Sequence, residues 1–186
     1  MTDNAAFIDH LITLAAPERD RGPLAILRRG ASGETRDLAR LYPLVLPWAP
    51  RDSSERAYIQ TACLFGLHPT KPSDQSRALS LGQAFRRYYL DTGSRPSVEG
   101  RFIALLRCHQ DELVEHLRHA IALIKDTQVP LRWTDVLFAL QRWESAEDSE
   151  FSAQRQWARD FWGFTKTVDD ADNAEELTTD TTGAAT

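Results

Sequence analysis

RALSLGQAFRRYYLDTGSRPSVEGRFIALLR, residues 77–107, is the stretch that decides the fold. Its apolar residues recur at helical spacing, through Ala78, Leu81, Phe85 and Tyr88 and then through Val98, Phe102, Leu105 and Leu106. The stretch holds six arginines against two acidic residues, a net of +4. At 100° per residue the arginines inside the two helices lie off these apolar stripes. The pattern therefore predicts two helices that bury aromatic faces and present arginine to solvent.

Helical periodicity continues along most of the remaining chain. Further helices are predicted at about residues 3–15, 21–30, 38–46, 55–67, 111–125, 133–143 and 151–164. Ser76 or Ser80 is expected to cap the helix that opens residues 77–107, and Ser97 the helix after it. No sustained alternation of apolar and polar residues and no Asn-Gly or Asp-Gly hairpin turn is present. The sequence predicts an all-α protein of about eight helices.

The sequence DTGSRP, residues 91–96, is the strongest break in the middle of the chain. We place a boundary there between an N-terminal helical subdomain, residues 1–93, and a C-terminal helical subdomain, residues 94–164. Each would form a small helical bundle. Residues 165–186 are low in complexity, with one lysine against six acidic residues. We expect them to form a disordered acidic C-terminal tail.

Composition excludes several classes of protein. Hydrophobic residues make up 42% of the 186 residues, which suffices for a packed core. The N-terminus has no basic region of a signal peptide, and the most apolar run, residues 41–50, is too short and proline-broken to cross a bilayer. Cys63 and Cys108 each lie in a predicted apolar helix, where buried free thiols are expected. We therefore expect a cytoplasmic protein without a membrane partner.

The net charge of −5 is unevenly distributed along the chain. Residues 19–107 carry 15 basic and 8 acidic residues, a net of +7, whereas residues 108–164 carry −4 and residues 165–186 carry −5. A chain with this separation can bind a polyanion despite its negative total. Nineteen of the 22 basic residues are arginine. Arginine suits phosphate contacts, but a GC-rich genome produces the same preference, and both explanations stay open.

The basic clusters are the best candidates for a binding site. They comprise Arg28, Arg29, Lys71, Arg77, Arg86, Arg87, Arg95, Arg101 and Arg107. For any single arginine a solvated helix face is the simpler interpretation, but the clustering favours a polyanion site. If the helices of residues 77–107 lie side by side, their arginines would line one groove with Arg28 and Arg29. Since no base-reading motif accompanies them, such a surface would contact phosphates and read little sequence.

A search for catalytic motifs yields little. No phosphate loop, dinucleotide fingerprint, Gly-flanked nucleophilic serine or helical HExxH is present, so neither an enzyme nor a cofactor is predicted. His116 and His119 are spaced to reach one ion, but a metal site needs three or four converging ligands, and we predict none. His68 is expected to satisfy carbonyls at its helix end. The tryptophans at helical spacing, Trp133, Trp143, Trp157 and Trp162, are expected in the core rather than stacked on bases.

The order of the motifs resembles one protein family. RGPLAILRRG, LFGLHP, SLGQAFRRY, EGRFIALLRCHQDELVEHLRHAIALIK, VPLRWTDVLFALQRWE and RQWARDFWGF follow one another as in the CasB family, the small subunit of the type I-E CRISPR Cascade surveillance complex. The resemblance covers about residues 19–164. Each motif alone is arginine, leucine and tryptophan at helical spacing, so the specific signal is their order.

The resemblance implies an all-α fold of two small bundles and a role without catalysis. It implies that two copies assemble beside the backbone and large subunits, where they hold guide RNA, single- and double-stranded target DNA and the displaced strand. Because guide pairing supplies sequence choice in such systems, phosphate contacts suffice. The contact residues that the resemblance carries over are Arg28, Arg29, Arg86, Arg87 and Arg101. One departure is Gly100, where the family pattern often has a second basic residue.

Two other interpretations stay open. A helical scaffold that binds only proteins would direct the same arginines at acidic partner surfaces. A histidine-based metalloenzyme would use His109, His116 and His119, with Glu112 and Glu115 nearby.

Overall fold

The computed structural model describes residues 4–16, 18–31, 38–70, 77–143 and 152–163. These residues form nine α-helices and one short 3-10 helix, and the one β-type pairing among them is an isolated bridge. The prediction of an all-α fold is confirmed. No helix in the described part of the chain has the length and apolar character needed to cross a membrane. The expected acidic tail, residues 165–186, lies outside the described residues.

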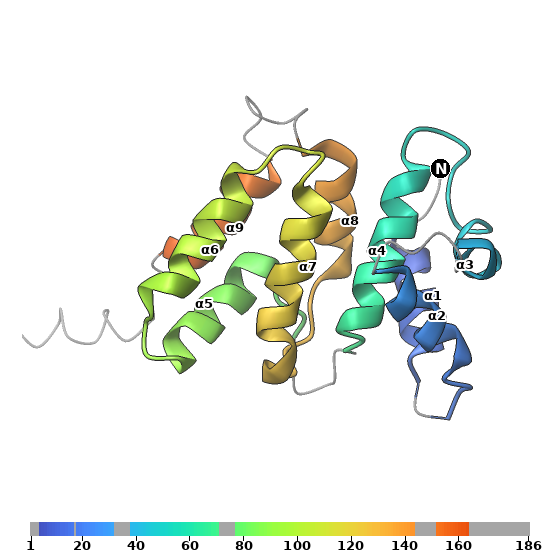
Figure 1. Ribbon diagram of the computed structural model, residues 1–186, viewed down its shortest axis with the longest axis horizontal. Coiled ribbons are helices and arrows are strands. Elements are labelled where there is room, and N and C mark those ends of the chain that lie inside the picture. The colour runs from blue at the N-terminus through green and yellow to red at the C-terminus, as the bar shows by residue number, and fades with distance from the viewer. Residues whose placement is uncertain (1–3, 17, 32–37, 71–76, 144–151, 164–186) are drawn as a thin grey trace, which may run out of the picture.

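The first four helices gather around α4. They are α1 (Asn4–Leu14), α2 (Gly22–Gly30), α3 (Leu38–Val45) and α4 (Glu55–Leu67). α4 is buried along most of its length, and α2 packs against it (Figure 1). A β-carbon at Gly66 would lie 2.6 Å from the backbone nitrogen of Arg28. The absence of a side chain there lets the two helix backbones approach.

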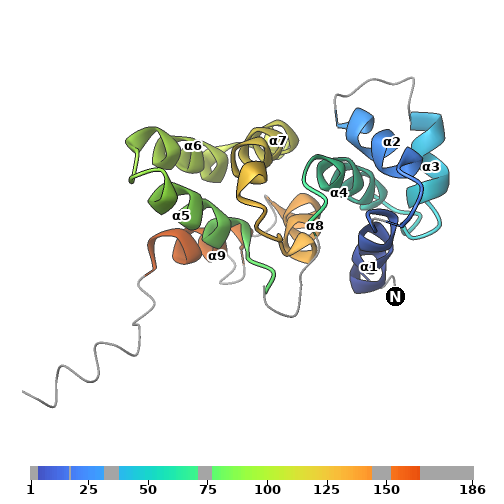
Figure 2. The same ribbon diagram turned by 90° about the horizontal axis from the view of Figure 1, so that it is seen from below.

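The remaining helices extend the molecule in the other direction. They are α5 (Leu81–Asp91), α6 (Pro96–Arg107), α7 (Leu113–Ile124), η2 (Lys125–Thr127), α8 (Trp133–Arg142) and α9 (Ala153–Trp162). α5 lies between α6 and α9 at one end of the molecule, α1 to α3 form the other end, and α4, α7 and α8 lie between them (Figure 2). One connected set of buried apolar side chains runs through all nine α-helices of the described residues.

The predicted break at residues 91–96 is a tight turn. Gly93 has a φ of 76° and Ser94 a φ of 56°, both in the left-handed region. α6 begins at Pro96 with Arg95 as its N-cap residue, so the prediction of Ser97 as the cap is wrong. Proline has a φ suited to the first helical position and starts the helix one residue earlier. α5 packs on α9 and touches α6, and a division into subdomains at residue 93 stays a prediction.

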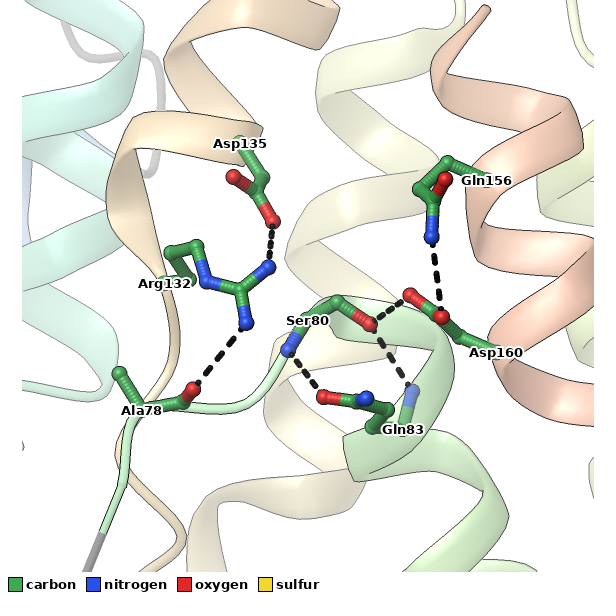
Figure 3. A network of polar contacts seen from close by, with 7 residues as sticks. All are labelled: Ala78, Ser80, Gln83, Arg132, Asp135, Gln156 and Asp160. Carbon is green, nitrogen blue, oxygen red and sulfur yellow. Dashed lines mark hydrogen bonds and ion pairs between the residues drawn. The ribbon is translucent and has the colours of Figure 1, made fainter. Parts of the chain in front are cut away.

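A polar network joins the start of α5 to α8 and α9 (Figure 3). The Ser80 hydroxyl accepts a hydrogen bond from the Gln83 backbone N–H at 3.2 Å and donates one to Asp160. The side-chain oxygen of Gln83 accepts a bond from the Ser80 N–H, which completes a capping box and confirms Ser80 as the cap. The backbone of Leu79 bridges to residues 130–132, through an Arg132 N–H bond to the Leu79 carbonyl at 2.7 Å. These bonds fix where α5 begins.

The cysteines and three of the four helix-spaced tryptophans are in the core, as predicted. Cys63 and Cys108 are free and buried, and burial raises the pKa of Cys63 to about 12 and that of Cys108 to about 11. Trp133, Trp143 and Trp157 are about 1% exposed. Trp162 is 41% exposed, which contradicts its predicted burial. It lies in the last turn of α9, where its ring covers the edge of the core formed by Phe102 and Phe161.

Candidate nucleic-acid interface

The structure describes eight of the nine predicted contact residues, since Lys71 lies outside the described residues. Seven are exposed and Arg86 is half-buried. They do not line one groove, so that expectation is wrong. Three separate hollows contain four of them: Arg86 and Arg87 line one between α5 and α9, Arg101 lines one between α6 and α7, and Arg28 lines one beside the end of α4.

Arg86 has a structural role that the sequence did not reveal. Its Nη1 donates hydrogen bonds to the carbonyl of Phe161 at 3.1 Å and to that of Gly163 at 2.9 Å. These carbonyls end α9, where the backbone lacks partners and the helix dipole favours a cation. Arg86 therefore caps α9 from the neighbouring helix, and its positive charge is partly used in that contact.

Arg87 points outward from the same helix. Its side chain is 61% exposed and its Nε lies 4.0 Å from the Asp91 carboxylate. The hollow that it lines also contains Arg159, together with Asp91 and Asp160. Two carboxylates thus offset much of the charge of three guanidinium groups. This hollow is a weak candidate for holding a polyanion.

The hollow between α6 and α7 has a different balance of charge. Its volume is about 520 Å³, and it is lined by Phe85, Arg101, Ala104, His116, His119, Ala120, Ala122 and Leu123. None of the described residues that line it is acidic. One carboxylate contacts a lining residue from outside the hollow: Glu115 Oε1 lies 3.1 Å from His119 Nε2. α6 and α7, which provide most of its lining, run side by side in Figure 1.

The hollow on the other side of α7 brings together three basic side chains. Arg28 comes from α2, Arg118 from α7 and Lys125 from η2, with Asp126 as the acidic residue in its lining and a volume of about 580 Å³. Arg28 Nε also donates to the Gly66 carbonyl at 3.2 Å, which fixes the direction of its side chain. Ala122 lines this hollow and the preceding one, so the two adjoin across α7.

Glu115 is the acidic residue that most affects this region. Arg118 Nε donates to Glu115 Oε2 at 2.9 Å, and a second bond joins Arg118 Nη2 to Oε1. This fork lowers the pKa of the Glu115 carboxyl and raises the pKa of Arg118. Both side chains stay charged at neutral pH. Arg118 therefore presents a guanidinium that is already held in a fixed orientation.

We call the set formed by Arg28, Arg101, Arg118, Lys125, His116 and His119 the α7 basic surface. It contains four permanent cations and two histidines, against Glu115 and Asp126. Sequence analysis identified Arg28 and Arg101 but missed Arg118 and Lys125, because both fall in a segment with a net charge of −4. Arg118 and Lys125 are seven residues apart, and residues at this spacing lie on the same face of a helix. This spacing was the feature of the sequence that could have indicated a shared basic surface.

The family of the chain follows from its sequence. The family model described as CRISPR-associated protein Cse2 matches residues 23–162. The chain belongs to the Cse2 family. A Cse2 protein of Thermus thermophilus is 28% identical over 167 residues, which cover 88% of this chain and 92% of that protein. The resemblance to the CasB family is thereby confirmed.

Solved structures of Cse2-like proteins share the fold. The crystal structure of CasB from Thermus thermophilus is 26% identical with a TM-score of 0.67, covering 88% of this chain and all of that one. A chain of a CRISPR RNA-guided surveillance complex is 22% identical with a TM-score of 0.64, covering 94% of each chain. That last match shows a common fold.

The other predicted contact residues of this Cse2-family chain lie apart from the α7 basic surface. Arg29 is exposed at the end of α2, Arg95 is the N-cap residue of α6, and Arg107 ends that helix. Arg77 precedes the polar network of Ser80. The side chains of Arg77, Arg95 and Arg107 form no hydrogen bond or ion pair with another described residue.

His68 links two distant parts of the Cse2-family fold. His68 is 2% exposed, and its Nε2 bonds the Val129 carbonyl at 2.6 Å, so it links α4 to a distant loop rather than satisfying carbonyls of its own helix. That prediction is wrong because the loop before α8 folds back onto the end of α4. Among the described residues, no group of three or more histidine, cysteine or acidic side chains converges as a metal site would require.

Proposed function

We propose that this Cse2-family chain is a non-catalytic subunit of a type I-E CRISPR Cascade surveillance complex that holds nucleic acid by its phosphates. The observation that carries the proposal is the α7 basic surface. Side chains from α2, α6, α7 and η2 converge there on two adjoining hollows. Family membership and the fold shared with a chain of a CRISPR RNA-guided surveillance complex support the choice of complex.

The chemistry of this surface suits phosphate rather than base recognition. Guanidinium groups bind phosphate oxygens in a forked geometry, and each contact releases counterions from the nucleic acid. The side chains of Arg101 and Lys125 form no hydrogen bond or ion pair with another described residue, so their donors are available. Since guide pairing supplies the sequence choice in RNA-guided complexes, a phosphate surface is sufficient for this subunit.

In this proposal the partners are the backbone and large subunits, a second copy of the chain, guide RNA and target DNA as single and double strands. In such a complex the exposed apolar side chains Tyr42, Leu90 and Ile103 would be available for contacts with neighbouring subunits. These contacts would occur in the cytoplasm. The same residues would serve a scaffold that binds only proteins, so nucleic-acid binding is the property that separates the two functions.

A salt titration of binding tests the proposal. We expect the purified chain to bind single- and double-stranded DNA and RNA at about 50 mM salt, with an affinity that falls linearly on a log–log plot as salt increases. The variants Arg101→Gln, Arg118→Gln and Lys125→Gln should each weaken binding to all sequences alike. Each should also reduce the magnitude of the salt slope by about 0.7–0.9 per lost phosphate contact.

Arg40→Gln is the matched control, because Arg40 is an exposed arginine of α3, which lies at one end of the molecule and away from α7 (Figure 1). It should bind as the parent does. Unchanged affinity and slope in all three α7 variants would show that the surface is assigned wrongly. No binding of the parent chain at low salt would favour the protein scaffold.

A further inference from the structure

The hollow between α6 and α7 differs in its lining from the adjoining hollow of the α7 basic surface. Five of its eight lining residues are apolar, namely Phe85, Ala104, Ala120, Ala122 and Leu123, and the other three are Arg101, His116 and His119. The hollow that contains Arg28 is instead lined mainly by polar residues. One hollow thus has an apolar interior with a cationic group at its edge, and its neighbour does not.

The size of this hollow fits a small organic group. Its volume of about 520 Å³ falls within the range of about 300–1,000 Å³ that is common for ligand sites. Phe85 and Ala120 are buried and form the floor of the hollow, whereas Arg101, Ala104 and His119 are exposed around its opening. A planar, largely apolar ring that carries an anionic group matches both parts of this lining.

We infer that the hollow between α6 and α7 is a seat for one unpaired nucleotide of a bound strand. Its nucleobase contacts Leu123 and the exposed alanines, Ala104 and Ala122, above the buried Phe85, and its phosphate contacts Arg101. This inference rests on the proposed function and deepens it, because it names the part of the nucleic acid that the surface takes.

The two histidines complete the edge of the seat. The His119 Nε2 lies 3.1 Å from the Glu115 carboxylate, and this contact holds the ring in place. His116 lies one turn before Ala120 and lines the same opening. An imidazole N–H donates to a phosphate oxygen or to a base edge. Arg101 is the permanent cation of this lining and supplies most of the attraction for the phosphate.

A paired strand cannot use this seat. In a duplex the bases are stacked inside the helix and only phosphates and groove edges reach a protein surface. An unpaired base can turn away from its neighbours and bury a face on apolar and aromatic side chains. The seat therefore favours single strands over duplexes, whereas the hollow with Arg28 holds both by charge alone.

Abasic oligonucleotides separate base contacts from phosphate contacts. Fluorescence anisotropy at low salt would compare a labelled thymidine oligonucleotide with an oligonucleotide of the same length and charge whose interior positions lack bases. We expect the parent chain to bind the abasic strand about five-fold or more weakly, as the loss of one stacked base predicts. Equal affinities, with salt dependence retained, would overturn the nucleotide seat and leave the proposed function standing. No binding of either strand would instead contradict the proposed function.

The variant Ala104→Leu tests the location of the seat. Ala104 is exposed on α6 and lines this hollow and not the one with Arg28. A leucine there fills the hollow and leaves every charge in place. We expect this variant to bind intact and abasic strands equally, at the affinity that the parent has for the abasic strand. If it still prefers the intact strand, the bases are bound elsewhere and the seat is assigned wrongly.

Ala25→Leu serves as the matched control, because Ala25 is an exposed alanine of α2 that lines neither hollow. It should keep the preference of the parent for the intact strand. Thermal unfolding of both variants checks that the added side chain leaves the fold intact.

Discussion

Two adjacent arginines of α5 should have unequal effects on stability when each is replaced by alanine. Arg86→Ala removes two hydrogen bonds from a guanidinium to the Phe161 and Gly163 carbonyls, at 3.1 and 2.9 Å. Arg87→Ala removes a contact of 4.0 Å between exposed side chains. The two changes delete the same atoms and the same charge, so each variant is the control for the other.

The expected magnitudes follow from the surroundings of each side chain. A hydrogen bond to a charged group contributes about 1.5–3 kcal/mol when buried, but the bond to Gly163 is solvent-exposed and contributes less. We expect Arg86→Ala to lower the free energy of unfolding by about 2 kcal/mol on these grounds. The exposed pair of Arg87 and Asp91 contributes at most about 0.5 kcal/mol.

Urea unfolding followed by circular dichroism measures this difference directly. For a chain of this size, a loss of about 2 kcal/mol corresponds to a fall in Tm of about 4–8 °C. The m-value should not change, since the same surface is exposed on unfolding. If the two variants differ by less than about 0.5 kcal/mol, a value typical of exposed pairs, Arg86 does not cap α9.

Four further predictions follow from individual residues. Burial disfavours the charged form of His68 and lowers its pKa. The contribution of His68 to the free energy of unfolding is therefore greatest above about pH 6.5, the ordinary histidine pKa. It falls as the pH decreases below that value, by at most about 1.4 kcal/mol per pH unit. Urea unfolding at about pH 7.5 and about pH 5, on either side of the ordinary histidine pKa, should show a larger loss for the parent than for His68→Gln, and equal losses would contradict the buried neutral state. Because the pKa of Cys63 is about 12, about one Cys63 thiol in 10⁴ is ionised at about pH 8. A thiol reagent should therefore label Cys63 rapidly only when urea has unfolded the chain. Labelling of the native chain at a comparable rate would show that the Cys63 thiol is accessible in the folded state. A β-carbon added at Gly100 of α6 meets nothing within 4 Å, so Gly100→Lys should stabilise the chain by about 1 kcal/mol and tighten DNA binding. Gly100→Ala should stabilise the chain without changing DNA binding. Equal DNA binding by the two variants would show that position 100 is outside the interface. Removal of residues 165–186, which carry a net charge of −5, should tighten DNA binding at about 50 mM salt and leave it unchanged at about 500 mM, where charge is screened; an effect that persists at high salt would require another explanation.

Much of the fold could be predicted because helices are local structures. Periodicity and caps are read within a few residues, and they located the helices and the Ser80 cap. The Ser97 cap is a local failure, by two residues, but the larger failures involve contacts between distant residues. Arg86 caps carbonyls that lie 75 and 77 residues away, and His68 bonds a carbonyl 61 residues away. No local pattern reveals such partners.

The candidate site was predicted only in part for a related reason. Net charge along the sequence distinguishes residues 19–107, at +7, from the rest of the chain. The α7 basic surface takes Arg28 and Arg101 from that segment but Arg118 and Lys125 from an acidic one. Which basic residues share a face depends on how α7 packs between α6 and α4 (Figure 1), and this packing is a property of the whole chain.

The position of Ala122 on both hollows has a mechanical consequence. α7 is the common wall of the two, and a helix of 12 residues moves nearly as a rigid rod. A displacement of α7 toward α6 narrows one hollow and widens the other. In the proposed function, groups bound in the two hollows would lie on opposite sides of α7, and the thickness of this single helix would set the spacing between them.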